Sequence, residues 1–189
     1  RVEIQALLDA TPAGGTLTLP DGEYPVSRAG SMYYALHVPA GVTVRGSGAT
    51  VIKQASGTAA SVRVFQMDGA GATLERLTID GNYAAQTVDE HRAGVFITAA
   101  DVTVRDLISR NFTGDGVYVY TGADRAFIDR VTATGNQRNG ITIAGGTGVT
   151  VVGGLYTGNL AQQVDSEPGT PNTVDDVTIA NVTIDAGAS

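Results

Sequence analysis

Residues 94–97 read Gly-Val-Phe-Ile, and matching quartets follow at 116–119 (Gly-Val-Tyr-Val), 140–143 (Gly-Ile-Thr-Ile) and 163–166 (Gln-Val-Asp-Ser). The quartets start 22, 24 and 23 residues apart, and each is followed by short runs in which apolar and polar residues alternate. A weaker copy precedes them at 65–67. A repeat of this length, built from short β-branched strands, indicates a solenoid whose coils stack on one another.

Strand alternation sorts the quartet side chains onto two faces. One face takes the apolar column Val95, Val117, Ile141 and Val164, and the other takes the row Phe96, Tyr118, Thr142 and Asp165. A single repeat cannot bury its apolar face, whereas strands paired in parallel ~4.8 Å apart can. We therefore predict an all-β parallel solenoid, with a corner ladder formed by the recurring Asn82, Asn111, Asn136 and Asn159.

The two ends of the chain differ. Residues 2–10 place Ile4, Leu7 and Leu8 on one helical face, which predicts an α-helical cap over the first coil. We expect one domain over 1–189, with the cap and first strands in 1–35 and the stacked coils in 36–185. No such cap follows Ile184, so we expect a processed or truncated piece whose open end is covered by a C-terminal continuation or by another copy in a homo-oligomer.

Composition excludes several classes of function. The chain has 189 residues, a net charge of −7, 42% hydrophobic residues, no Cys and two His. The 12 basic residues are scattered against 19 acidic ones, which argues against nucleic acid as a partner. No apolar run reaches the ~18 residues of a membrane helix. We expect no metal and no cofactor, because thiolate and multi-histidine sites are excluded and the acidic pairs fit solvated turns.

A family resemblance rests on two stretches. Residues 4–24 contain Ile-Gln-Ala, Gly-Gly-Thr and Leu-Pro-Asp-Gly-Glu-Tyr, and residues 77–82 read Leu-Thr-Ile-Asp-Gly-Asn. Together they resemble the opening of pectin-lyase-like right-handed parallel β-helix proteins. That superfamily includes polysaccharide lyases, polygalacturonases, mannuronan C5-epimerases and phage tailspikes. The resemblance implies a right-handed single-stranded β-helix, a glycan groove along the first strand of each coil, and an extracellular or virion-surface location.

The catalytic motifs of those relatives do not carry over residue by residue. The epimerases have a Tyr-Gly-Phe-Asp-Pro-His-type strand, and its nearest counterpart at 115–120 contains no His. The Gly-His-Gly strand of polygalacturonases has no equivalent at 139–141, and the basic and calcium-binding clusters of pectate lyases are not evident. The motifs that carry the resemblance therefore indicate the fold and leave the reaction open.

Asp165 and Glu167 are the first catalytic candidates. Positions i and i+2 of a strand face the same way, ~6.6–7 Å apart, and two carboxylates over one groove are what glycoside hydrolysis requires. Repulsion between them would raise the pKa of one and separate an acid from a base. The structural alternative is that Glu167 pairs with an arginine and Pro168 ends the strand.

Other residues of the expected groove complete the candidate site. Asp115 is a possible third acid or a turn residue, and Tyr118 and Tyr120 suit stacking on sugars or are merely good strand formers. The remaining candidates for substrate binding are Arg138, His91, Arg92 and Gln163. His91 and Arg92 end a long segment that we expect to form a groove wall. Arg138 either binds a sugar acid or neutralises Asp165 and Glu167.

Three functions follow as hypotheses, all with a polysaccharide or oligosaccharide as partner. The first is a glycoside hydrolase that works through Asp165 and Glu167. The second is a polysaccharide lyase or uronate C5-epimerase, which needs a base and a neutralised uronate. The third is a non-catalytic binding or structural segment of a tailspike or surface fibre.

Overall fold

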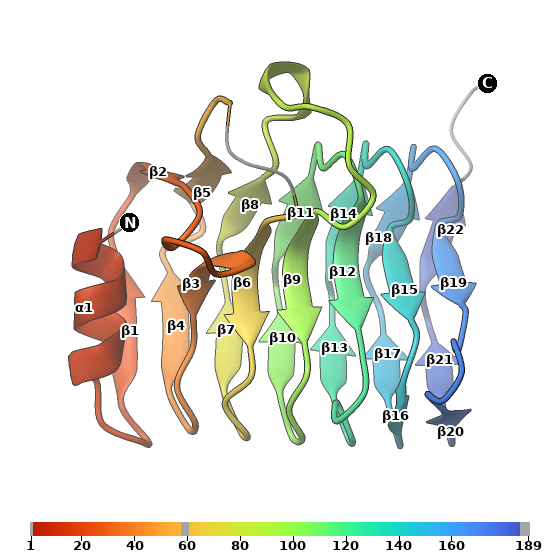
Figure 1. Ribbon diagram of the computed structural model, residues 1–189. Helices are drawn as coiled ribbons and strands as arrows, with labels where there is room; N and C mark the ends of the chain where they lie inside the picture. The colour runs from red at the N-terminus through yellow and green to blue at the C-terminus, as the bar shows by residue number, and fades with distance from the viewer. Residues whose placement is uncertain (1, 58–60, 186–189) are drawn as a thin grey trace.

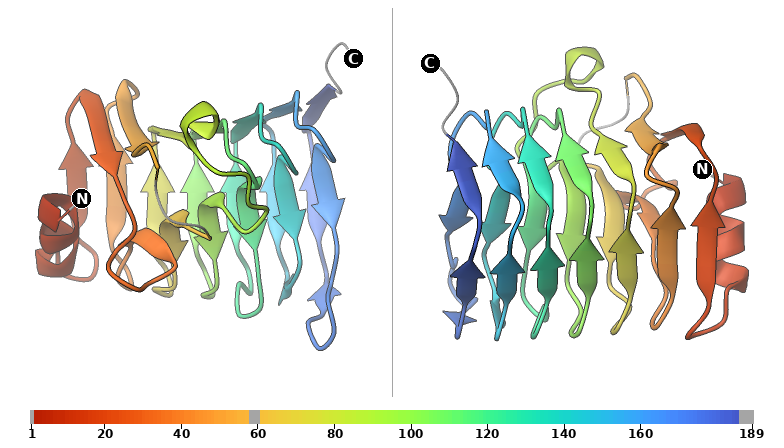
Figure 2. Two further views of the ribbon diagram at one scale, coloured as in Figure 1. Left: turned by 45° about the horizontal axis from the view of Figure 1, so that its top comes forward. Right: turned by 180° about the vertical axis from the view of Figure 1, so that it is seen from behind.

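The computed structural model describes residues 2–57 and 61–185. The chain winds around one axis and forms three long parallel sheets that run along it (Figures 1 and 2). The first sheet contains β1 (Thr16–Leu19), β4 (Thr43–Gly46), β7 (Thr73–Glu75), β10 (Thr103–Arg105), β13 (Phe127–Asp129), β17 (Thr150–Val152) and β21 (Thr178–Ala180). The second contains β2 (Gly22–Val26), β5 (Thr50–Gln54), β8 (Thr78–Asp80), β11 (Ile108–Arg110), β14 (Thr132–Thr134), β18 (Leu155–Thr157) and β22 (Thr183–Asp185). The third, called here the groove sheet, contains β3 (Tyr34–His37), β6 (Arg63–Met67), β9 (Ala93–Ile97), β12 (Asp115–Val119), β15 (Ile141–Ile143) and β19 (Val164–Ser166).

Each complete coil gives one strand to each long sheet, and the strands pair with their copies in the adjacent coils, the two end strands of a sheet having one such partner each. A short pair, β16 (Gly146–Thr147) and β20 (Val174–Asp175), and one 3-10 turn, η1 (Tyr83–Ala85), complete the described elements besides α1. This architecture confirms the predicted parallel β-solenoid.

The register of the groove sheet confirms both predicted rows, although Thr142 of the outward row is fully buried. Val117 pairs with Val95 and Ile141, and Ile141 pairs with Val164. The first three are fully buried, whereas Val164 of the last groove strand is partly buried. The outward row continues further than expected, because His37, Gln66 and Phe96 occupy consecutive coils before Tyr118. The outward face of this sheet is therefore a continuous strip over six coils.

The predicted cap is present as α1 (Val2–Ala10), which lies against the first coil (Figure 1). Ile4 and Leu8 are buried there, but Leu7 is 53% exposed. The expectation for Leu7 was wrong because three residues at this spacing span more of the helix surface than the coil covers. Gln5 fixes the helix to β3 by accepting a hydrogen bond from the His37 backbone N–H and donating one to its carbonyl.

The asparagine ladder is only partly as predicted. Asn136 and Asn159 are buried and stacked, with the Asn136 side chain donating to Asn159 Oδ1 over 2.8 Å. Asn111 instead occupies a left-handed corner and donates to Asp80. The backbone N–H of Phe112, and not the Asn111 side chain, donates to Asn136 Oδ1. Asn82 is also left-handed, and its side chain donates to the Gln54 carbonyl.

The far end of the described solenoid carries exposed apolar side chains. Ile179 and Ile184 lie in the last strands of their sheets and are 43% and 56% exposed. Residues 186–189 lie outside the described part of the chain. The expectation that another subunit or further coils cover this end stays a prediction, as does the single-domain boundary. Among the described residues, no helix is long and apolar enough to cross a membrane.

We predict that Ile141→Ala lowers the free energy of unfolding by about 2–5 kcal/mol, because it opens a cavity in the inward column between Val117 and Val164. Urea denaturation with an unchanged m-value is the measurement. Ile184→Ala makes the same chemical change at an exposed position and should cost about 0.5 kcal/mol or less. Equal costs for the two substitutions would contradict a core built from stacked columns.

Candidate functional site

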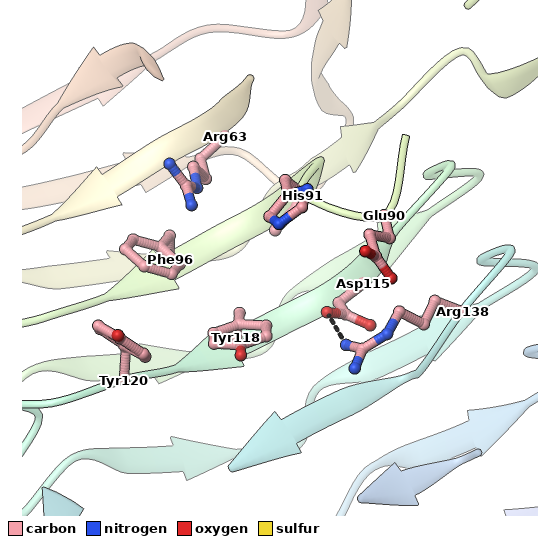
Figure 3. Close-up of a pocket in the computed structure, with 9 residues that line it drawn as sticks. Arg63, Glu90, His91, Phe96, Asp115, Tyr118, Tyr120 and Arg138 are labelled. Carbon is pink, nitrogen blue, oxygen red and sulfur yellow. Dashed lines mark hydrogen bonds and ion pairs between the residues drawn. The ribbon is translucent and has the colours of Figure 1, made fainter. Parts of the chain in front are cut away.

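A pocket of about 390 Å³ opens on the outer face of the groove sheet. It is lined by Arg63, Glu90, His91, Ala93, Phe96, Asp115, Tyr118, Tyr120 and Arg138. Strands β6, β9 and β12 supply its floor, and the segment before β9 supplies Glu90 and His91 (Figure 3). Titratable and aromatic side chains from several coils therefore meet in one hollow.

Asp115 is the acid on the floor of the pocket. It begins β12 and is only 1% exposed. One carboxylate oxygen accepts from the Asn139 backbone N–H over 3.0 Å, and the other accepts from Arg138 over 2.8 Å. Burial raises the pKa of Asp115 to about 6, although the Arg138 guanidinium and the Asn139 N–H pull the pKa down. The predicted third acid is therefore a buried group that titrates near neutral pH.

Arg138 joins two acids from different coils. Its guanidinium forms ion pairs with both Asp115 and Glu167. Burial disfavours the charge on Arg138, but these two carboxylates outweigh that effect and raise its pKa above the usual range. Arg138 therefore stays cationic and holds Asp115 in place from the next coil.

Asp165 and Glu167 lie beside the pocket and are not among its lining residues. Burial, and then the neighbouring Glu167 carboxyl, raise the pKa of Asp165, whose Oδ2 accepts from Asn139 over 3.0 Å. The Glu167 side chain is 37% exposed and is bound by Arg138, which is the arrangement that the structural alternative anticipated.

Three aromatic rings form a shelf along one side of the pocket. The Phe96 centroid lies 5.5 Å from that of Tyr118 and 5.7 Å from that of Tyr120, and the two tyrosine centroids are 6.1 Å apart. Burial, followed by the nearby Glu167 charge, raises the pKa of Tyr118, so its hydroxyl stays protonated. The predicted pair of outward tyrosines is thus brought together with a phenylalanine from the preceding coil.

The segment before β9 reaches the pocket differently from what we expected. His91 lines the pocket and is well exposed, with Asp89 3.3 Å from its Nδ1. Arg92 does not enter the groove: it is 1% exposed and donates to Gln86. The expectation for Arg92 was wrong because the chain turns into β9 at this residue and the side chain falls on the inner face.

Gln163 also lies away from the pocket lining. Its side chain accepts from Asn159 Nδ2 over 2.7 Å and donates to the Asn159 carbonyl over 3.0 Å. The amide is therefore engaged at the asparagine corner, and the structure places Gln163 with the ladder, whereas we expected it in the groove.

Sequence reasoning left Arg63, Glu90 and Phe96 out of the site. The sequence held a signal for Arg63, which stands two residues before Phe65 as Asp115 stands two before Val117. The register of the folded chain agrees, since Arg63 pairs with Ala93 and Ala93 pairs with Asp115. The upstream copy of the repeat was too weak to fix that alignment. Among the described residues, no group of three or more His, Asp or Glu side chains could hold a metal ion.

Comparison with known proteins places this geometry in context. The model of the family described as "Right handed beta helix region" matches residues 38–155. Mannuronan C5-epimerase AlgE6 from Azotobacter vinelandii is 39% identical over 100 residues, which cover 48% of this chain and 11% of that protein. The chain thus spans about a tenth of the length of this relative.

A solved structure, the A-module of mannuronan C-5 epimerase AlgE4 from Azotobacter vinelandii, superposes with a TM-score of 0.63 at 22% identity. The match covers 99% of this chain and 68% of that module, and at this identity it establishes the fold alone. The resemblance to right-handed parallel β-helix proteins is confirmed.

Asp115 should make stability fall as pH rises from 4 to 7. The folded pKa of about 6 lies above the ordinary 3.8, so the stabilisation is complete below about pH 4 and is lost through pH 6. We expect the difference in unfolding free energy, wild type minus Asp115→Asn, to become more negative by about 2–3 kcal/mol over this interval.

Denaturation series at several pH values measure that difference. Asp101→Asn is the matched control, because the hydrogen bond from Arg125 lowers the pKa of exposed Asp101 and moves its titration below this interval. A wild-type/Asp115→Asn difference that stays flat from pH 4 to 7 would refute a raised pKa at Asp115.

Proposed function

Because the chain belongs to the right-handed β-helix family, we propose that its pocket binds an acidic polysaccharide and acts at C5 of a uronate residue, as an epimerase or a lyase does. The observation that carries the proposal is Asp115, a nearly buried acid with a pKa of about 6, set among Arg138, Tyr118 and His91 in one pocket. The similarity to a protein named a mannuronan C5-epimerase supports the same substrate class.

The proposed reaction begins with loss of the C5 proton. The carboxyl group bonded to C5 acidifies that proton, and its removal leaves an enolate whose electrons rest on the carboxyl oxygens. Return of a proton to the opposite face of C5 inverts the sugar, which is epimerisation. Departure of the oxygen substituent at C4 instead forms a C4=C5 double bond, which is lyase chemistry. Both outcomes need a base and a nearby cation.

Asp115 is the proposed base. A catalytic base works best when its pKa lies near the operating pH, and burial brings Asp115 close to that condition. Each carboxylate oxygen that bonds to Arg138 or Asn139 keeps a second lone pair for a proton. Arg138 supplies positive charge beside the position where the enolate forms, which stabilises the transition state.

Tyr118 and His91 are the proposed proton donors for the two outcomes. Tyr118 lies on the sheet side of the pocket with its hydroxyl protonated, on the same strand as Asp115. His91 comes from the wall segment and faces the pocket from another side (Figure 3). A donor opposite the base leads to inversion at C5, whereas a donor beside the base can protonate the departing C4 oxygen.

The shelf of Phe96, Tyr118 and Tyr120 supports glycan binding independently of any chemistry. Pyranose rings present apolar faces that pack on aromatic rings, while a tyrosine hydroxyl can still hydrogen-bond to sugar hydroxyls. The non-catalytic binding module therefore remains as the second candidate, distinguished by the absence of turnover.

Asp115→Asn should reduce exchange of the C5 proton by about 10²–10⁴-fold while oligosaccharide binding is retained, because the amide keeps the shape of the acid and cannot accept the proton. Deuterium incorporation at C5 in D₂O, followed by NMR across a panel of polyuronates, measures exchange for both outcomes. Ultraviolet absorbance of the new C=C bond identifies a lyase, and inverted sugar without that absorbance identifies an epimerase.

Asp101→Asn, on a remote exposed ion pair, should leave exchange unchanged. New reducing ends without the C=C absorbance would mean hydrolysis and would move the chemistry to Asp165 and Glu167. Binding of a polyuronate by the wild type with no exchange, no C=C and no new reducing ends would identify a binding module.

A further inference from the structure

Arg63 is a half-buried cation in the pocket without an acid to neutralise it. Its side chain lines the pocket, yet none of the described carboxylates forms an ion pair with it. Other arginines of the outer surface, such as Arg45, Arg110 and Arg125, are each ion-paired to an Asp or Glu. Arg138 in the same pocket is already held by two acids. Arg63 is therefore the pocket cation that is free to meet an incoming anion.

The Arg63 guanidinium is held by aromatic rings. Its central carbon lies 4.3 Å from the Phe96 centroid and 6.0 Å from the Tyr33 centroid. Arg28 approaches Tyr33 in turn, at 5.0 Å, and is tied to the carbonyl oxygens of Ser31 and Met32. Stacking of this kind fixes the plane of a guanidinium and leaves its N–H edge free for bidentate hydrogen bonds to a carboxylate.

Burial without a paired acid has an electrostatic cost. Desolvation lowers the pKa of Arg63, and the Tyr118 and Asp89 side chains offset that effect only in part. A bound anion would restore the missing counter-charge, so the pocket is electrostatically incomplete at this position.

The position of Arg63 separates it from the reacting carbon. Arg63 and Asp115 lie on strands two coils apart, about 10 Å along the axis, and Figure 3 shows Phe96 between Arg63 and the two tyrosines. The carboxyl group of a reacting uronate is bonded directly to C5, so it must lie beside Asp115 and Arg138. Arg63 is placed to meet a different carboxylate.

We propose that Arg63, held against the rings of Phe96 and Tyr33, forms an anion subsite for the carboxylate of a neighbouring sugar, so that the chain selects polymers with uronate on successive residues. This inference rests on the proposed function for the position of the reacting sugar. Arg63 is a specificity-determining residue in this scheme and takes no part in proton transfer.

Calorimetric binding of three probes tests the subsite: a uronate tetrasaccharide, the same tetrasaccharide with its carboxyls reduced to alcohols, and the free uronic acid. We expect Arg63→Gln to weaken binding of the acidic tetrasaccharide by about 10–100-fold, the range for a lost charge-assisted hydrogen-bonded contact. Binding of the reduced tetrasaccharide should not change. Arg63→Lys should recover only part of the loss, because an ammonium keeps the charge and loses the planar fork.

Arg125→Gln is the matched control, since it removes an arginine charge at an exposed ion pair outside the pocket and should leave all three affinities unchanged. Thermal unfolding of each variant verifies that it is folded. Wild-type affinity of Arg63→Gln for the acidic tetrasaccharide, or an equal loss for the reduced one, would overturn the subsite.

The C5 exchange assay separates this proposal from the proposed function. Arg63-dependent binding without exchange would leave the subsite standing and refute the chemistry. Exchange that depends on Asp115, with a tetrasaccharide affinity that Arg63→Gln does not change, would support the chemistry and refute the subsite. Failure of the wild type to bind any carboxylated probe would overturn the subsite.

Discussion

In-register parallel pairing between coils is the constraint on which the structure depends. Each groove-sheet strand takes its position from the strand of the previous coil, so a residue's place on the outer surface follows from its coil and its position in the strand. A slip of one residue in β12 would turn Tyr118 inward and bring Val117 to the surface. The inward column of buried apolar residues prevents that slip, so the hydrophobic core also fixes the geometry of the pocket.

The site is consequently assembled from neighbouring coils and not from one segment. Asp115 and Tyr118 come from β12, Arg138 from the turn into β15, and Glu167 from the end of β19. Charges that would be unfavourable within one coil are neutralised by the next, as Arg138 does for Asp115 and Glu167. On the other side of the pocket, aromatic rings from the coils before and after Arg63 hold its guanidinium.

Residues inside the repeat could be predicted from sequence, and residues at its borders could not. The strands, the inward column, the outward row and the helical cap follow from period-2 and helical patterns, which depend only on local spacing. Arg92 and Gln163 stand where the chain enters a strand, and there the direction of a side chain depends on the turn rather than on alternation. The Arg138–Glu167 pair, 29 positions apart in the chain, was one of two alternatives from the sequence, and the choice between them depended on rotamers that no spacing rule specifies. Arg63 went unnoticed because only the folded register places it in line with Asp115.

The double ion pair of Arg138 ties the proton on Asp115 to the net charge of the cluster formed by Asp115, Arg138 and Glu167. With Asp115 ionised, one guanidinium faces two carboxylates and the cluster carries one excess negative charge. When Asp115 takes up a proton, the cluster becomes neutral and Arg138 keeps only Glu167 as an ionised partner. In the proposed reaction, the enolate charge forms as Asp115 accepts the proton, beside an Arg138 that then has one ionised partner fewer, so proton uptake by Asp115 would assist stabilisation of the anion.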